Sequence, residues 1–125
     1  MLELPKTAVL AFDESGVVEI HADATTAAIA YEGIDVESGV VSFFDADGHG
    51  LDAHFITPNE HGSLLRFLKW VKSGTYTLVL AAEPEKPIAL AFSEAVALEK
   101  NEWFETLDAL MAHLRSRGVV VDFSP

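Results

Sequence analysis

Short apolar and alternating runs in the first half of the chain predict β-strands. They form two expected hairpins, the first from Thr7–Phe12 with Gly16–His21 and the second from Val40–Phe44 with Leu51–Ile56. The last of these strands alternates cleanly, with Leu51, Ala53 and Phe55 at its apolar positions. Asp52 and His54 stand between them. We expect the apolar set to face the core and the polar pair to face solvent.

Helical periodicity and end signals predict three helices. Their expected ranges, each written from its N-cap residue, are Asp23–Glu32, Ser63–Lys72 and Asn101–Arg117. A glycine stands at or just after the end of each range, and glycine readily takes the left-handed conformation of a Schellman ending. Gly33, Gly74 and Gly118 are therefore expected to have positive φ.

The second half of the chain is expected to add three strands, at Thr75–Ala82, Ile88–Phe92 and Val119–Phe123. The first of these has an uninterrupted apolar centre, which predicts burial on both faces in the middle of a sheet. Residues 57–62 are interpreted as a linker, and residues 93–100 either extend a strand past a bulge or form a helical turn. Together the elements predict a single α+β domain over residues 1–125, a mostly antiparallel sheet of about six or seven strands with three helices packed on it.

Composition narrows the class of protein. A chain of 125 residues fits one domain, and a domain of this size buries about two thirds of its unfolded surface. The absence of cysteine excludes disulfides and thiolate metal sites. The first residues lack a basic segment followed by an apolar run, and no stretch has the length of a membrane span. We therefore expect a cytoplasmic protein, and a secreted protein whose signal has been removed is the alternative.

The net charge of −12 is concentrated in the first half of the chain. Residues 1–62 contain twelve Asp and Glu against Lys6 alone, whereas residues 63–125 contain eight acids and seven bases. Such a field repels nucleic acid and anionic lipid, which bind through Lys and Arg, and it attracts basic partners. The alternative is that the acidity serves solubility only.

We expect a binding surface around the second hairpin. Its candidate residues are the acids that precede the two strands, join them or lie within the second: Asp35, Glu37, Asp45, Asp47 and Asp52. Their combined field would reach over a Debye length of about 8 Å at physiological salt. Charge complementarity of this kind favours rapid, salt-sensitive association with a basic protein.

Sequence signatures of catalysis and metal binding fit the chain poorly. The loop at residues 45–50 has acids at its first and third positions and glycine at its sixth, as an EF-hand loop has, but Ile56 stands where a bidentate glutamate is needed. His49 and His54 lack a third histidine at a metal-like spacing, and Ser63 lacks a nucleophile motif. We expect no catalytic residue, no metal ligand and no cofactor.

Phosphate binding is also weakly indicated. Neither a Walker pattern nor GxGxxG is present. Arg66, Lys69 and Lys72 are spaced by three, which gives either a ridge for a phosphate or an acidic partner, or a solvated helix face. Paired carboxylates are almost inevitable among twenty acids and indicate chemistry only beside a pocket and shifted pKa values.

One segment carries a family resemblance. After the first expected helix come IDVESG at residues 34–39, a strand, FDADG at residues 44–48 and a second strand. In this order, residues 22–55 resemble a group of small, acidic bacterial proteins of uncharacterised function. The resemblance implies a shared fold element and assigns no functional residue.

These observations favour a non-catalytic domain that masks a basic protein partner, with neither nucleic acid nor membrane as a partner. A bacterial immunity protein that neutralises a toxin, often a nuclease, has this size and acidity. One alternative is a small-ligand-binding or enzymatic domain, which would have a deep pocket lined by Trp70 or Trp103. Another is a homo-oligomeric structural protein, which would expose a broad apolar patch, and the oligomeric state stays open.

Overall fold

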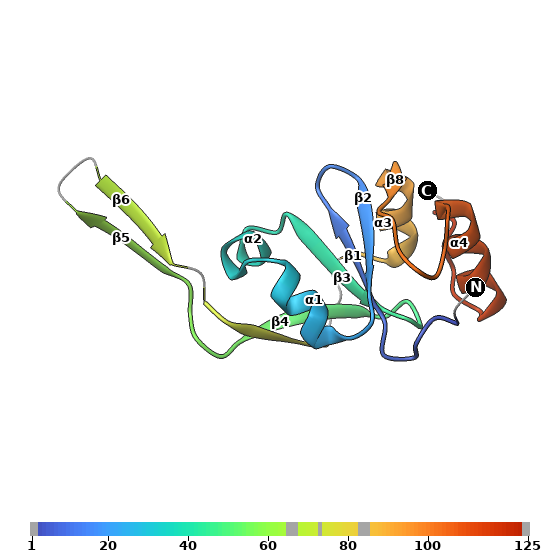
Figure 1. Cartoon of the computed structure of the whole chain (residues 1–125), viewed down its shortest axis with the longest axis horizontal. Coiled ribbons are helices and arrows are strands. Elements are labelled where there is room, and N and C mark those ends of the chain that lie inside the picture. The colour runs from blue at the N-terminus through green and yellow to red at the C-terminus, as the bar shows by residue number, and fades with distance from the viewer. Residues whose placement is uncertain (1–2, 65–67, 73, 83–85, 124–125) are drawn as a thin grey trace.

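A mixed six-stranded sheet organises the chain (Figure 1). The computed structural model describes residues 3–64, 68–72, 74–82 and 86–123, with the backbone alone for residues 61–64 and 68–72. In spatial order the strands of the main sheet are β7 (Tyr76–Leu80), β4 (Gly50–Phe55), β3 (Val41–Asp45), β1 (Val9–Asp13), β2 (Val17–His21) and β8 (Ala97–Leu98). All neighbours pair antiparallel except β2 and β8, which pair parallel. The expected α+β class is confirmed.

Helices cover both faces of this sheet. In chain order the described helices are α1 (Ala24–Ala30), α2 (Gly33–Glu37), α3 (Ile88–Glu94) and α4 (Leu107–Ser116). One apolar cluster joins α1 and α2 to one face, and a larger cluster joins α3 and α4 to the opposite face. Even α4, the longest of these helices at ten residues, lacks the length needed to span a bilayer.

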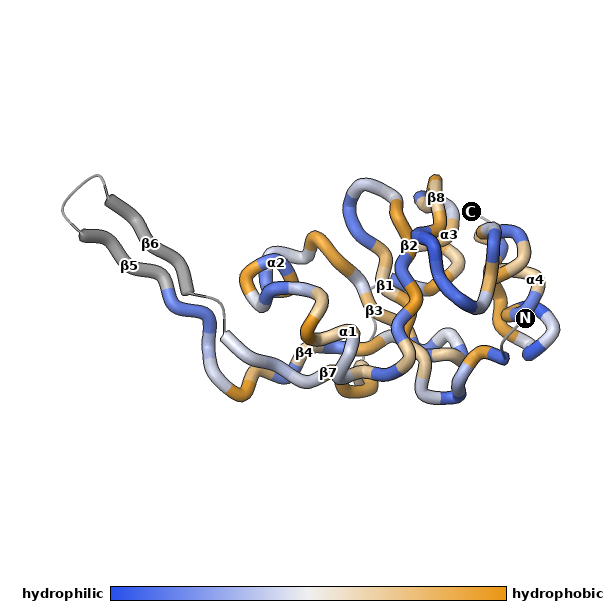
Figure 2. The backbone as a smooth tube through the Cα atoms, in the orientation of Figure 1, coloured by the Kyte–Doolittle hydropathy of each residue, from blue (hydrophilic) through white to orange (hydrophobic). Residues whose placement is uncertain are grey.

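The central strand β1 supplies side chains to both clusters. Val9 packs on the α1 side and Leu10 on the α3 and α4 side, because successive side chains of a strand point to opposite faces. Phe12 makes edge-to-face contacts with Phe44 and Phe92, with ring centroids 5.4 and 5.0 Å apart. Hydrophobic residues accordingly run along β1 and β3 where the helices cover the sheet (Figure 2).

The strand expected in the middle of the sheet lies at its edge. The prediction for Thr75–Ala82 is correct in type, since β7 occupies Tyr76–Leu80, but wrong in position. Val79 and Leu80 remain 46% and 66% exposed. The helices cover the centre of the sheet around β1, so apolar composition alone did not determine which strand is buried on both faces.

Both expected hairpins of the first half are confirmed. Val9 pairs with His21 in the first, and Phe43 pairs with Leu51 in the second. The first turn is stabilised by Asp13, whose Oδ1 accepts hydrogen bonds from the N–H groups of Ser15 and Val17. The expected orientation of β4 is also confirmed, because its apolar residues are partly buried while its two polar ones are exposed.

The observed helix ends agree in part with those predicted from the sequence. Asp23 caps α1 as expected, accepting a hydrogen bond from Thr26 N–H at 2.8 Å. Gly118 ends α4 with φ of 86°, and Val119 N–H donates to Leu114 O, as a Schellman motif requires. For Gly33 the expectation is wrong, because this glycine begins α2 and is not among the glycines with positive φ.

The Schellman glycine of this region is Gly39, with φ of 77°. Its N–H donates to Val36 O, and Val40 N–H donates to Asp35 O. The residues 34–39 that looked like a turn therefore contain most of a second short helix and its ending. Gly74 was also expected to end a helix, but it lies between strands and lacks positive φ.

The expected helix at Ser63–Lys72 is wrong. Its residues fall in a two-stranded sheet, β5 (Glu60–Leu64) and β6 (Leu68–Lys72), which also takes up part of the expected linker. Along the chain β5 follows β4 and β6 precedes β7, and the chain changes direction between the main sheet and the pair of β5 and β6, which extends away from it (Figure 1). Together the four strands make up the two legs of one long hairpin. We call β5 and β6 the arm.

The strand ladder is interrupted between the arm and the pair of β4 and β7. Phe55 stands opposite Tyr76, and Glu60 stands opposite Lys72. Four residues on one leg therefore face three on the other. Thr57 and Thr75 are joined there by their hydroxyls at 2.8 Å.

Three further expectations for the second half need correction. Ile88–Phe92 belongs to α3, whose Ile88, Ala91 and Phe92 fall on one buried helical face. The last expected helix begins late, because Thr106 caps α4 and Asn101 caps a preceding turn instead. Residues 119–123 form no strand, although Val121 is buried. Residues 93–100, left open above, end α3 and supply β8.

Candidate functional site

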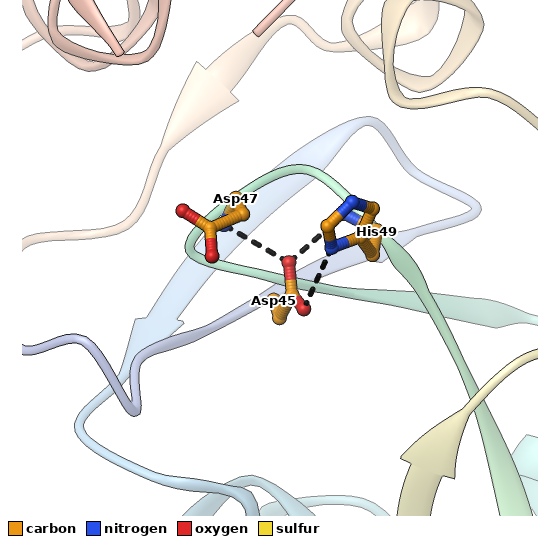
Figure 3. Close-up of side chains that lie close together, drawn as sticks. All are labelled: Asp45, Asp47 and His49. Carbon is orange, nitrogen blue, oxygen red and sulfur yellow. Dashed lines mark hydrogen bonds and ion pairs between the residues drawn. The ribbon is translucent and has the colours of Figure 1, made fainter. Parts of the chain in front are cut away.

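The turn between β3 and β4 holds two of the five predicted binding acids in an internally bonded loop (Figure 3). Asp45 Oδ1 accepts hydrogen bonds from the N–H groups of Asp47 and His49, each at 2.9 Å, and its Oδ2 lies 3.3 Å from His49 Nδ1. Gly48 completes the reversal with φ of 84°. These bonds give Asp45 a structural role in the turn.

The same turn brings together the ligand atoms of Asp45, Asp47 and His49, all within 4.8 Å of one another. They are already engaged, since Asp47 Oδ1 also accepts a hydrogen bond from Arg117 Nη2 at 3.0 Å. Strands rather than helices flank the loop, unlike the helices of an EF-hand. The absence of a specific cation site here stays a prediction.

The other three predicted acids lie elsewhere. Asp35 and Glu37 are exposed on α2, beside the start of β3, whereas the turn is at its far end (Figure 1). Asp52 is exposed on β4. Glu37 and Asp52 line one open depression of about 640 Å³, where β3 and β4 diverge. Asp45 and Asp47 therefore share the turn, and Glu37 and Asp52 share the depression.

Glu37 is further engaged in a joint at the base of the arm. The Asn59 amide donates to Glu37 Oε2 and, at 3.0 Å, to Gly33 O, while its Oδ1 accepts from Gly74 N–H at 2.7 Å. One side chain therefore ties α2 to both legs of the long hairpin. We call Gly33, Glu37, Asn59 and Gly74 the arm joint.

A buried polar group on β2 was missed by the sequence analysis. His21 and Glu19 lie on the α1 side of the sheet, where Tyr31 Oη donates to Glu19 Oε2. The same Glu19 oxygen lies 4.0 Å from His21 Nε2, which is buried and has no hydrogen-bond partner among the described residues. Burial lowers the pKa of His21, against the smaller opposing effects of Glu19 and Asp23.

Because of this burial, we expect His21 to make the fold less stable as the pH falls below about 6.5. The unfolded chain takes up a proton at the ordinary histidine pKa, whereas the folded chain takes it up only at lower pH. Urea unfolding at several pH values measures the effect. His21→Gln should flatten the dependence, and a dependence that is unchanged in this variant would contradict the assignment.

The tryptophan-lined pocket of the ligand-binding alternative is not found at Trp103. Trp103 is 8% exposed and packs in the larger core cluster. The side chains of Trp70 and of the expected ridge at Arg66, Lys69 and Lys72 lie outside the described residues, as do those of His61 and Ser63.

A feature that the sequence analysis did not predict is the free edge of β7. β7 and β8 are the two edge strands of the main sheet, and β8 has only two residues. Native proteins usually protect a long edge strand with charge, proline or a bulge. Residues 73–82, which include β7, contain neither a charged residue nor proline.

The orientation of the main-chain groups of β7 follows from its pairing with β4. Ile56 N–H donates to Thr75 O, and Ala81 N–H donates to Gly50 O. Hydrogen-bonded and non-hydrogen-bonded pairs alternate in an antiparallel ladder, so every second residue of β7 bonds to β4. The residues between them direct their N–H and C=O groups to the free edge: Tyr76, Leu78 and Leu80.

An apolar groove of about 370 Å³ lies between α1 and β7. Ala28 and Ile29 of α1 line one wall, and Tyr76 and Leu78 of β7 line the other. Ile29 is 81% exposed, and among the described lining residues Glu32 alone is charged. Burial raises the pKa of Tyr76 to about 12, and its hydroxyl donates to Tyr31 O. The groove thus joins apolar side chains to an unpaired strand edge.

The chain matches no protein-family model, no curated protein and no solved structure in the comparisons made with known proteins. The resemblance of residues 22–55 to small acidic bacterial proteins therefore stays a prediction.

Proposed function

We propose that this protein is a non-catalytic binding domain that adds an extended segment of a basic partner protein to the free edge of β7. The observation that carries the proposal is a five-residue edge strand without charge, proline or bulge beside an apolar groove. In such binding the main chain supplies affinity, and pockets for alternate side chains supply specificity.

Charge favours a basic partner. The chain has a net charge of −12, and the described lining of the groove contains Glu32 and no base. Glu32 lines the groove, and Asp52, one of the predicted binding acids, stands opposite Val79 in the register of β4 with β7. Lys or Arg in the bound segment would pair with these carboxylates at little desolvation cost, because both are exposed.

The biological role that we attach to this binding is the masking of a basic protein, as a bacterial immunity protein masks a toxin. A cytoplasmic location is part of the same proposal. The proposed binding site differs in one respect from the acidic surface expected from the sequence. The partner is held by a strand edge and a groove, and acids assist at their border, because Asp47 and Glu37 are already engaged by Arg117 and Asn59.

The proposal is tested by selecting extended peptides from a random displayed library on the whole chain. We expect the selected peptides to alternate apolar residues with Lys or Arg, and their binding to weaken as salt rises. Leu80→Pro should weaken binding about tenfold or more, because it removes an N–H that points to the free edge and is not bonded to β4. Amide hydrogens of Leu78 and Leu80 should gain protection from exchange on binding.

Leu80→Thr is the matched control. It shortens the same exposed side chain and keeps the N–H, so the affinity of the peptides should change little. Selection of acidic peptides, or binding that is indifferent to Leu80→Pro, would show that the edge of β7 is not the binding site.

A further inference from the structure

In the arm, each of the two described strands pairs only with the other. β5 and β6 pair with each other and with no other described strand, and Figure 1 shows them extending beyond the main sheet. An isolated two-stranded hairpin is at best marginally stable in water. A further contact would add to the stability of the extended arm.

The composition of the arm differs from that of the rest of the chain. Residues 60–72 contain three bases against Glu60, and six large apolar residues. The remaining chain contains nineteen Asp and Glu against five Lys and Arg. The arm is thus the basic, apolar and extended kind of segment that the edge of β7 is proposed to bind.

We propose that the arm of one molecule binds the β7 edge and the α1–β7 groove of a second copy of this chain, and that the second copy does the same in return. The inference rests on the proposed function of that edge and names its partner. Charge complementarity favours this occupant, because the arm is basic and the body that it meets is strongly acidic.

The geometry of the long hairpin permits this exchange. β4 and β5 lie along one leg of the long hairpin and β6 and β7 along the other. In the proposed dimer a two-fold axis at Gly74 places Leu68–Lys72 of each copy antiparallel to Tyr76–Leu80 of the other. The two segments have five residues each and match in length. Such an interface is isologous and closed, and it leaves neither edge free.

This arrangement links self-association to partner binding. In the dimer both β7 edges are covered, and in the monomer they are open. A basic partner therefore competes with the arms, and dimerisation protects an apolar edge that would otherwise invite aggregation.

Sedimentation equilibrium of the full chain, from low micromolar to near-millimolar concentration, tests the dimer. The arm variant Lys69→Glu/Lys72→Glu and the edge variant Leu80→Pro should each raise the dimer dissociation constant about tenfold or more. Leu80→Thr should leave it nearly unchanged. Circular dichroism and the unfolding midpoint at low concentration should remain those of the parent in all three.

Mixing the two weakened variants gives a sharper test. In the mixed dimer the intact arm of the edge variant meets the intact edge of the arm variant, so one of two contacts is restored. The mixture should associate more tightly than either variant alone. A parent chain that stays monomeric, or a mixture no tighter than its components, overturns the exchange of arms.

The peptide selection repeated on the arm variant separates the two proposals. Peptides that bind it and are lost on adding Leu80→Pro would support the proposed function even if the parent chain is monomeric. A dimer that dissociates in both variants, without any peptide binding, would support the exchange of arms alone.

Discussion

Replacing Leu110 with alanine is expected to lower the free energy of unfolding by about 3 kcal/mol. The Leu110 side chain is fully buried in the larger core cluster, together with Leu10 of β1 and Leu114 of α4. The cavity cannot collapse easily, because β1 is paired on both sides and cannot shift toward the helix. Urea unfolding monitored by circular dichroism measures the change.

Val120→Ala serves as the control for this substitution. Val120 follows the same helix, and its side chain is 73% exposed. Its truncation should change the free energy of unfolding by no more than about 0.5 kcal/mol. Similar losses in the two variants would mean that Leu110 does not belong to the larger core cluster as described.

The features predicted correctly from the sequence are those encoded over a few neighbouring residues. Asp23 caps α1 through its own side chain, and Gly118 ends α4 through bonds within six residues. The turns at Asp13 and Asp45 are likewise closed by hydrogen bonds over at most four residues. Local signals of this kind do not depend on the rest of the fold.

The wrong predictions of secondary structure fall on short segments whose apolar residues fit both a helix and a strand. Residues 63–72 have the apolar spacing of a helix, yet their two halves pair as strands because β4 and β7 already form the hairpin that they extend. The opposite error occurred at Ile88–Phe92, a short apolar run that is mostly Ala and Leu and forms α3. Tertiary pairing determined the first outcome, whereas Ala and Leu favour the helix in the second.

The candidate site could not be predicted from the sequence for a related reason. The groove and the free edge depend on β7 lying outside β4, and strand order is a property of the whole sheet. The sequence did contain one usable signal, the absence of charge and proline across residues 73–82, which was interpreted as burial. An apolar strand without charge either lies in the centre of a sheet or has a free edge that can pair with a strand of a partner.

The second large effect on folding stability is expected at Gly74, in the arm joint. This glycine was expected to be required for its conformation, but the structure indicates that it is required for space. A Cβ atom on Gly74 would lie 2.0 Å from Thr57 O and 2.6 Å from the carbonyl carbon of Pro58. Both are backbone atoms, so no change of side-chain rotamer relieves the contact.

Gly74→Ala is therefore expected to cost about 3 kcal/mol of folding free energy, at the upper end for overpacking. Opening the joint to admit the methyl group would also separate Gly74 N–H from Asn59 Oδ1. Gly118→Ala is the matched control. Its Cβ would meet nothing within 4 Å, so only the strain of φ at 86° remains, about 1 kcal/mol. Urea unfolding of the two variants should thus rank Gly74→Ala as clearly the more destabilised. If the order is reversed, the two legs of the hairpin do not approach at Gly74, and the two-fold axis proposed there has no basis.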